Sequence, residues 1–181
     1  MSKQVASAPE ESPRDLARAE FLKGMRAVPG AVAIIAVASE GKVTGMAATA
    51  WNSLCADPPM LLVCVNRKAS AHPLIRTGGG FSVNLVPSHE RELVATFSGQ
   101  RGLDGSNRFV EGQWRTGGRG HPLLKGAAAS FECECVAEHA HGTHSIFVGK
   151  VGEVHSDPRA EALLYIAGAF ARAETLDAPA P

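Results

Sequence analysis

Alternation of apolar and polar side chains along residues 127–136 constrains the fold of this chain more than any other sequence feature. The stretch SFECEC at residues 130–135 places Phe131, Cys133 and Cys135 on one side and the serine and two glutamates on the other. Successive side chains of a β-strand point to opposite faces of a sheet. This period of two therefore predicts a strand with one buried face and one solvent-exposed face.

Most of the remaining chain also has strand character. Strands are predicted at residues 31–38, 43–51, 60–65, 81–85 and 145–155, the first as an apolar run covered on both faces. Helices are predicted at residues 12–29, 70–75 and 89–97, and residues 162–170 fit either a helix or a strand. Because strands and helices do not alternate regularly, the pattern favours an antiparallel β-barrel or sandwich over a doubly wound nucleotide-binding fold.

Start signals define the first helix. Ser12 is the predicted N-cap, and Pro13 occupies the first helical position, where its missing N–H removes no hydrogen bond. The apolar side chains along this helix are Leu16, Phe21, Leu22 and Met25. They give the helix an apolar side, and Pro29-Gly30 is predicted to end it.

The length of 181 residues favours a single domain. We place this domain at residues 12–172, between a flexible N-terminus at residues 1–11 and a flexible C-terminal tail at residues 173–181. Lys plus Arg and Asp plus Glu both number 18, so the formal net charge is zero. Without a net field, neither nucleic acid nor an anionic membrane is an expected partner.

Cysteine usage and hydropathy predict a cytoplasmic protein. The four cysteines, Cys55, Cys64, Cys133 and Cys135, lie mainly inside apolar runs, as reduced core thiols do. Because Cys133 and Cys135 have no second pair at zinc-ligand spacing, no metal site is expected. The N-terminus has no secretory signal pattern, and no segment reaches about 18 uninterrupted apolar residues.

Residues 44–75 contain the candidate binding site. Small residues come first, and along them a backbone can approach a flat ligand closely: Gly45, Ala47, Ala48, Thr49 and Ala50. A cluster of donors and cations that suits a phosphate group follows: Asn66, Arg67, Lys68 and Ser70. These features favour a site for a phosphorylated ring system. From composition alone, a solvated hairpin end explains the basic cluster equally well.

Other motifs favour structural roles. The triple glycine at residues 78–80 lacks the spacing of a phosphate loop or a dinucleotide fingerprint, so we interpret it as a turn. His139, His141 and His144 resemble a metal-ligand string, yet no second ligand element is evident, and a solvated turn explains His139 and His141 better. Neither Ser53 nor Ser130 lies in a nucleophile elbow, which disfavours a hydrolase.

Longer stretches of the chain resemble the flavin reductase-like family. The matching segments are VPGAVAIIAV, GMAATAWNSLCADPPMLLVCVNRKASAHPLI, FSVNLV, RFVEGQW, GHPLLKGAAASFECECV and GTHSIFVGKV. They cover most of residues 26–170 in the family's order. Members of this family are small NAD(P)H:flavin oxidoreductases and include the reductase components of two-component monooxygenases.

The resemblance implies a mainly β fold, an FMN-binding split β-barrel with a few peripheral helices, usually a homodimer with flavin beside the subunit interface. By position, the flavin ring and ribityl chain would contact Thr49, Ala50, Trp51, Asn52 and Ser53. The phosphate would be bound by Asn66, Arg67, Lys68 and Ser70, and the groove would be closed by Phe81 and Asn84. His144 would lie near the nicotinamide as the catalytic residue. Two positions depart from the family pattern: Lys68-Ala69 replaces a common Ser-Ser pair, and Trp51 stands where smaller residues are frequent.

The function that this resemblance implies is transfer of a hydride from NADH or NADPH to FMN or FAD. The reduced flavin would then serve a partner flavin-dependent monooxygenase. Two alternatives stay open: an enzyme that retains FMN and reduces a substrate of its own, and a non-catalytic flavin- or haem-binding protein built on the same barrel.

Overall fold

The computed structural model describes residues 13–174 and residue 176. The predicted N-cap Ser12, the predicted flexible segment 1–11 and most of the predicted tail 173–181 lie outside the described residues. The helices are α1 (Pro13–Arg26), α2 (Ala71–Gly78) and α3 (Glu92–Phe97), with the short 3-10 helices η1 (Ser88–Glu90) and η2 (Gly105–Arg108). The strands are β1 (Gly30–Ala31), β2 (Ala33–Ser39), β3 (Lys42–Ala48), β4 (Trp51–Ala56), β5 (Pro59–Asn66), β6 (Gly80–Leu85), β7 (Trp114–Thr116), β8 (Pro122–Leu124), β9 (Ala129–His141), β10 (His144–Ser156), β11 (Leu164–Ile166) and β12 (Ala169–Ala171).

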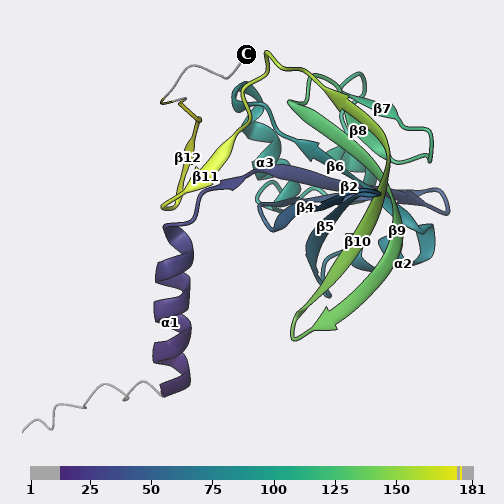
Figure 1. Cartoon of the computed structure of the whole chain (residues 1–181). Helices are drawn as coiled ribbons and strands as arrows, with labels where there is room; N and C mark the ends of the chain where they lie inside the picture. Colours follow the sequence, from purple (N-terminus) through teal and green to yellow (C-terminus); the bar gives the residue numbers. More distant parts are fainter. Residues whose placement is uncertain (1–12, 175, 177–181) are drawn as a thin grey trace, which may run out of the picture.

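One antiparallel sheet of seven strands, in the order β3-β2-β6-β9-β10-β5-β4, dominates the molecule. Its edge strands β3 and β4 are consecutive in the chain, and only Thr49 and Ala50 separate them. Because so short a connection spans about 10 Å, the two edges lie close together at this end, so the sheet is curled (Figure 1). The result is a barrel left open between β3 and β4, with helices at its periphery, which confirms the predicted mainly β architecture.

Alternate residues of β2 belong to two separate hydrophobic cores. Ile35 and Val37 belong to the first core, which the curled sheet and α2 enclose. Ile34 and Ala36 belong to the second core, which includes side chains of α3. All four side chains are 0% exposed. The apolar run at residues 31–38 therefore forms a strand covered on both faces, as predicted.

The polar face of β9 is partly buried, which corrects the prediction that this face is wet. Glu132 is only 1% exposed. Its carboxylate accepts backbone N–H groups from Arg119 and His121, each at 2.9 Å, so the loop between β7 and β8 covers it. Gly117 permits this approach, because a Cβ there would lie 2.6 Å from the Glu132 carboxylate. Alternation along one strand cannot predict that a distant loop folds over its polar side.

A second carboxylate fixes the same loop from β10. Glu153 accepts hydrogen bonds from the Gly118 backbone N–H at 2.9 Å, from Arg115 at 2.9 Å and from His155 at 2.7 Å. These bonds, led by that of Gly118, lower the pKa of the Glu153 carboxyl to about 2. The carboxylate therefore stays ionised, and the loop stays attached, across the neutral range.

The β9–β10 hairpin is longer than the sequence indicates. β9 continues to His141 and β10 begins at His144, so the prediction of a solvated turn across these residues is wrong. His139 pairs with Ile146, and His141 pairs with His144. Residues 138–141 are exposed on both faces of the hairpin, so they show no alternation from which a strand can be predicted.

Smaller differences concern element boundaries and one thiol. The ambiguous residues 162–170 contain β11 and part of β12, and the predicted helix at 89–97 consists of η1 and α3. The predicted strand at 43–51 is interrupted, since β3 ends at Ala48 and β4 begins at Trp51. Cys133 is buried, but Cys55 is exposed and is not a core thiol.

Helix α1 stands away from the sheet (Figure 1). The side chains of its predicted apolar side are exposed: Leu16 by 52%, Phe21 by 65%, Leu22 by 44% and Met25 by 48%. None of the described helices is long and apolar enough to cross a membrane. The apolar side chains of α1 are thus left uncovered by the described part of the chain.

Candidate functional site

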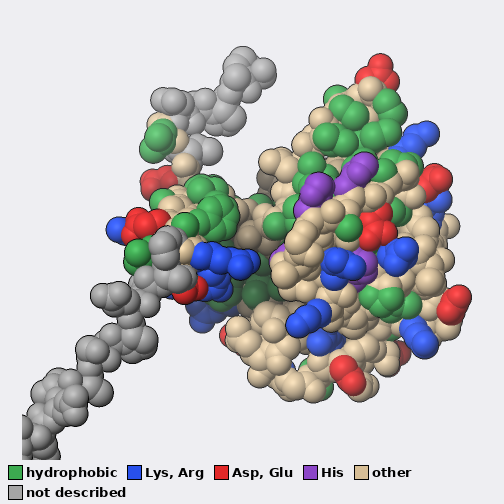
Figure 2. All heavy atoms as spheres, turned by 90° about the horizontal axis from the view of Figure 1, so that it is seen from below, with side chains coloured by type: hydrophobic (Ala, Val, Ile, Leu, Met, Phe, Trp, Pro, Cys, Tyr) green, Lys and Arg blue, Asp and Glu red, His purple; other side chains and the backbone are tan. Residues whose placement is uncertain are grey.

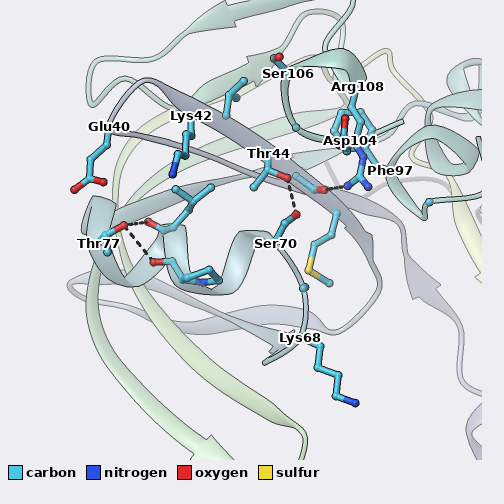
Figure 3. A pocket seen from close by; sticks show the side chains of 18 of the residues that line it. Glu40, Lys42, Thr44, Lys68, Ser70, Thr77, Phe97, Asp104, Ser106 and Arg108 are labelled. Atoms are coloured by element: carbon cyan, nitrogen blue, oxygen red, sulfur yellow. Dashed lines mark hydrogen bonds between the residues drawn. The ribbon is translucent and has the colours of Figure 1, made fainter. Parts of the chain in front are cut away.

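A cleft of about 1030 Å³ opens beside β3. Its walls are β3 with the preceding turn, residues 68–70 with the first turns of α2, and residues from the segment 97–108 (Figure 3). Pockets for nucleotide-sized ligands have volumes of about 300–1,000 Å³. The cleft is therefore large enough for a phosphorylated ring system.

Gly45 brings the segment 97–108 onto β3. A Cβ at this position would lie 2.9 Å from the Ile35 carbonyl oxygen and 3.0 Å from the Phe97 ring. Only glycine allows the aromatic ring to pack so closely on the strand. The small residue at this point of the predicted shelf thus serves the packing of Phe97, which lines the cleft.

Arg108 holds the wall opposite residues 68–70. Its Nη1 donates to the Gly45 carbonyl oxygen at 2.8 Å (Figure 3). Its Nε donates to the Leu103 carbonyl oxygen at 2.8 Å. These two bonds tie the segment around η2 to β3. The position of this wall is therefore set by the hydrogen bonds of the Arg108 guanidinium to two backbone carbonyl groups.

Two hydroxyls meet in the cleft. The Ser70 Oγ and Thr44 Oγ1 atoms are 2.8 Å apart (Figure 3). In such a pair one hydroxyl donates to the other, so one of the two protons remains free to bond an acceptor. The pair therefore supplies a donor to an anionic ligand.

The turn that follows β5 presents two cations. The Asn66 Oδ1 atom accepts the Lys68 backbone N–H at 2.9 Å, which fixes the turn. The Arg67 and Lys68 side chains are exposed. Within residues 13–174 and 176, neither has a carboxylate at ion-pair distance. Unpaired cations beside a free hydroxyl suit the phosphate of a ligand, which supports the phosphate assignment.

The tip of the β9–β10 hairpin lies against this turn. The Arg67 backbone N–H donates to the Thr143 carbonyl oxygen at 2.9 Å, and His144 pairs with Asn66 in the β10–β5 register. His144 is exposed, and its Nδ1 lies 2.8 Å from the Thr143 hydroxyl. Figure 2 shows histidine side chains on one face of the molecule with Lys and Arg side chains nearby. The fold thus brings His144 close to the turn that carries Arg67 and Lys68, although these predicted site residues lie far apart in the sequence.

The predicted ring-binding residues lie on or next to the edge strand β4. Ala50 accepts the Cys64 backbone N–H at 2.8 Å, which places it beside β5. The Trp51 indole N–H donates to the Ala31 carbonyl oxygen at 2.9 Å. Trp51 and Ser53 line a second hollow of about 270 Å³, while Thr49, Ala50 and Asn52 are exposed and line neither cavity. Of the predicted cofactor-binding residues, those that line the large cleft are Lys68 and Ser70.

Phe81 and Asn84 do not close a groove, which corrects their predicted role. Both side chains are 0% exposed. Phe81 belongs to the first core. The Asn84 amide donates to the Ile34 carbonyl oxygen at 3.2 Å, and its Oδ1 accepts the Leu124 backbone N–H at 2.9 Å. Asn84 is instead a buried group whose bonds join β2, β6 and β8.

The cleft-lining residues that sequence reasoning missed include Thr44, Phe97 and Arg108. The signal nearest to them was the long Gly- and Arg-rich stretch from residue 98 to 125, a length that in compact domains is more often functional. That signal indicates a segment, but it does not indicate which side chain reaches β3.

Comparisons with known proteins show the family to which this chain belongs. A family model described as "Flavin reductase like domain" matches residues 25–174. The chain is 37% identical over 148 residues to "FMN reductase (NADH) RutF" of Stutzerimonas stutzeri (strain A1501), covering 82% of this chain and 84% of that protein. It is 32% identical over 157 residues to "4-hydroxyphenylacetate 3-monooxygenase reductase component" of Escherichia coli, covering 86% and 92%.

A solved structure shows the same fold. The Streptomyces globisporus C-1027 NADH:FAD oxidoreductase SgcE6, in complex with NAD and FAD fragments, superposes with a TM-score of 0.80 at 26% identity. The match covers 95% of this chain and 100% of that one. With a family model that spans most of its length and curated relatives above 30% identity, this chain belongs to the flavin reductase like domain family.

Proposed function

We propose that this protein is an NAD(P)H-dependent flavin reductase that transfers a hydride from reduced nicotinamide to FMN or FAD. The observation that carries the proposal is the turn of residues 66–70, where unpaired cations and a free hydroxyl meet both the large cleft and His144. Relatives named as NADH-dependent FMN reductases and as an NADH:FAD oxidoreductase support the same reaction.

The chain itself supplies binding and orientation. Arg67, Lys68 and Ser70 hold the ribityl phosphate, and backbone groups at residues 49–53 contact the ring system. The bound flavin supplies the redox chemistry by accepting the hydride. The protein need only place two planar rings within reach of each other and exclude misaligned arrangements. His144, beside the phosphate-binding turn, orients the nicotinamide.

The reduced flavin serves a partner monooxygenase. One relative is named as the reductase component of a 4-hydroxyphenylacetate 3-monooxygenase, which supports this role. Release to a partner requires a modest affinity for flavin. The exposed, unpaired side chains of Arg67 and Lys68 agree with a ligand that binds and leaves.

The proposed enzyme acts as a homodimer in the cytoplasm. Support for the dimer comes from α1, whose apolar side chains are 44–65% exposed. An uncovered apolar surface of this kind is unusual on a monomer and marks an interaction site. A second copy of the chain is the partner that the family resemblance implies. All four cysteines are free, as is usual for proteins of the cytoplasm.

Steady-state oxidation of NADH and NADPH in the presence of FMN and of FAD tests the proposed activity. We expect NAD(P)H oxidation that requires added flavin and saturates with it. Absence of oxidation with every pairing, in protein that binds flavin, would identify a non-catalytic binding protein instead. Stoichiometric FMN retained through gel filtration, with turnover independent of added flavin, would identify an enzyme that reduces its own substrate.

Replacing His144 separates nicotinamide orientation from flavin binding. His144→Ala should lower kcat about tenfold, since a misaligned nicotinamide reacts more slowly, and should leave the Kd of FMN within about twofold. The matched control is His141→Ala, which removes the exposed cross-strand neighbour on the same hairpin. Equal turnover in the wild type and His144→Ala would remove this histidine from the mechanism.

Replacing Arg67 tests the phosphate assignment. Loss of a charge-assisted hydrogen bond costs about 1.5–3 kcal/mol, so Arg67→Ala should weaken FMN binding about tenfold or more. Riboflavin lacks the phosphate and serves as the internal control, with an affinity expected to change less than about twofold. Fluorescence quenching of each flavin gives both constants. Parallel losses for the two ligands would show that Arg67 does not contact phosphate.

Sedimentation velocity tests the dimer. The wild type should sediment at twice the 18.9 kDa chain mass. Phe21→Asp places a charge on the exposed apolar surface of α1 and should shift the population toward the monomer. Lys23→Gln is the control, because Lys23 pairs at 3.9 Å with Glu20 and both are highly exposed. A wild type that stays monomeric at tens of micromolar would contradict the proposed dimer.

A further inference from the structure

A series of hydrogen-bonded polar side chains, buried at His72 and Ser145, joins α2 to the β9–β10 hairpin. His72 Nε2 lies 2.8 Å from Ser145 Oγ, which in turn donates to Glu138 Oε1 at 2.8 Å. The other carboxylate oxygen of Glu138 accepts Arg76 Nε at 2.9 Å. His72 is 7% exposed and Ser145 is 0% exposed. Two secondary structure elements are thus linked through a hydroxyl that water does not reach.

The direction of the bonds follows from the serine hydroxyl. Ser145 has one proton, and it donates this proton to Glu138. The same oxygen can only accept from His72, so the imidazole carries its proton on Nε2. Every member of the chain is then satisfied. Removal of the hydroxyl leaves the buried His72 N–H with only the Glu138 oxygen at 3.4 Å, a longer distance than a normal hydrogen bond.

These three residues are not a hydrolytic triad. In a triad the two ring nitrogens of the histidine bond the serine and the acid separately, and the serine is open to substrate. Here a single nitrogen, Nε2, faces both Ser145 and Glu138, and Ser145 is 0% exposed. The geometry of His72, Ser145 and Glu138 therefore suits a role in holding structural elements in position.

Both residues that flank His144 in the sequence, Thr143 and Ser145, form hydrogen bonds to the segment from Arg67 to His72. On one side, the Thr143 carbonyl oxygen accepts the Arg67 N–H at 2.9 Å. On the other side, Ser145 bonds His72, at the start of α2. The segment from Arg67 to His72 carries the proposed phosphate-binding residues. His144 is therefore held between two bonds that both lead to the segment that binds the flavin phosphate.

We propose that Ser145, His72 and Glu138 are positioning residues that keep His144 in register with the phosphate-binding turn. This inference rests on the proposed function. It assigns a task to three side chains that lie outside the proposed ligand-binding residues. The backbone bond from Arg67 holds only the turn at Thr143. The side-chain bond between His72 and Ser145 prevents the exposed hairpin tip from shifting along α2.

Ser145→Thr and Ser145→Val test the proposal, because both add a branch of similar size and only threonine keeps the hydroxyl. We expect Ser145→Thr to retain wild-type kcat with NADH and Ser145→Val to lose about tenfold in kcat. The KM for FMN should change less than twofold in both. The imidazole NMR signal of His144, assigned by its absence in His144→Ala, should shift in the valine variant only.

Further variants keep the test decisive. If Ser145→Val does not fold, Glu138→Ala replaces it, since alanine removes the acceptor of the Ser145 proton and should give the same loss of kcat and the same shift of the His144 signal. Glu153→Gln is the matched control, because Glu153 also lies on β10 and bonds Arg115, away from the hairpin tip. It should keep wild-type turnover and the wild-type His144 signal.

Two results would overturn the inference: equal kcat and equal His144 signals in the threonine and valine variants, or the same loss of kcat in Glu153→Gln. Failure of the proposed function is a separate outcome. A wild type that oxidises no NADH with any flavin rejects the reductase assignment. The NMR comparison still decides whether the hydroxyl holds His144.

Discussion

The register of β5 against β10 is the constraint on which the site depends. These strands pair from His144 with Asn66 to Lys150 with Met60. Val63, Val65 and Phe147 are all 0% exposed, and they belong to the first core. A slip by one residue would turn these side chains to the opposite face and expose them. Burial of apolar side chains inside the barrel thus fixes the register, and the register places Asn66 opposite His144 at the end of the two strands.

The cleft depends on a second constraint, which comes from outside the sheet. Its far wall is formed by residues of the segment 97–108, and that segment has little regular structure beyond η2. Gly45 lets Phe97 pack on β3, and Arg108 bonds the carbonyl oxygen of the same glycine. One position on β3 therefore joins the wall to the barrel, both by close packing and by a hydrogen bond.

Sequence patterns predicted the strands well because burial is periodic along them. The apolar run at residues 31–38 became β2, and the alternation at residues 127–136 became the first part of β9. The patterns failed where a distant segment covers a polar side chain. Glu132 and Asn84 alternate as solvent-facing residues do, yet a loop and strand β8 supply their bonds. Such contacts are absent from any local window of sequence.

Only part of the site was predicted, because local sequence patterns reveal residues that are adjacent in the chain and not those brought together by the fold. The basic turn was recognisable because Arg67 and Lys68 are adjacent in the chain, and the structure leaves both exposed. His144 was predicted as a site residue from the family resemblance, and no local sequence pattern indicated it. Thr44 and Arg108 escaped notice because each reaches the cleft through a contact with another element, Ser70 in one case and Gly45 in the other.

Bonding capacity separates the polar residues that build this fold from those that we propose bind ligands. Asn84, Glu132 and Ser145 are buried, and their polar atoms are bonded within the described part of the chain. Arg67, Lys68 and His144 are exposed and gather at one end of β5 and β10. An unmet donor is costly in the core and cheap at the surface. The proposed ligand-binding donors therefore lie at the surface, at the end of the β5–β10 register where the hairpin tip lies beside the turn of residues 66–70.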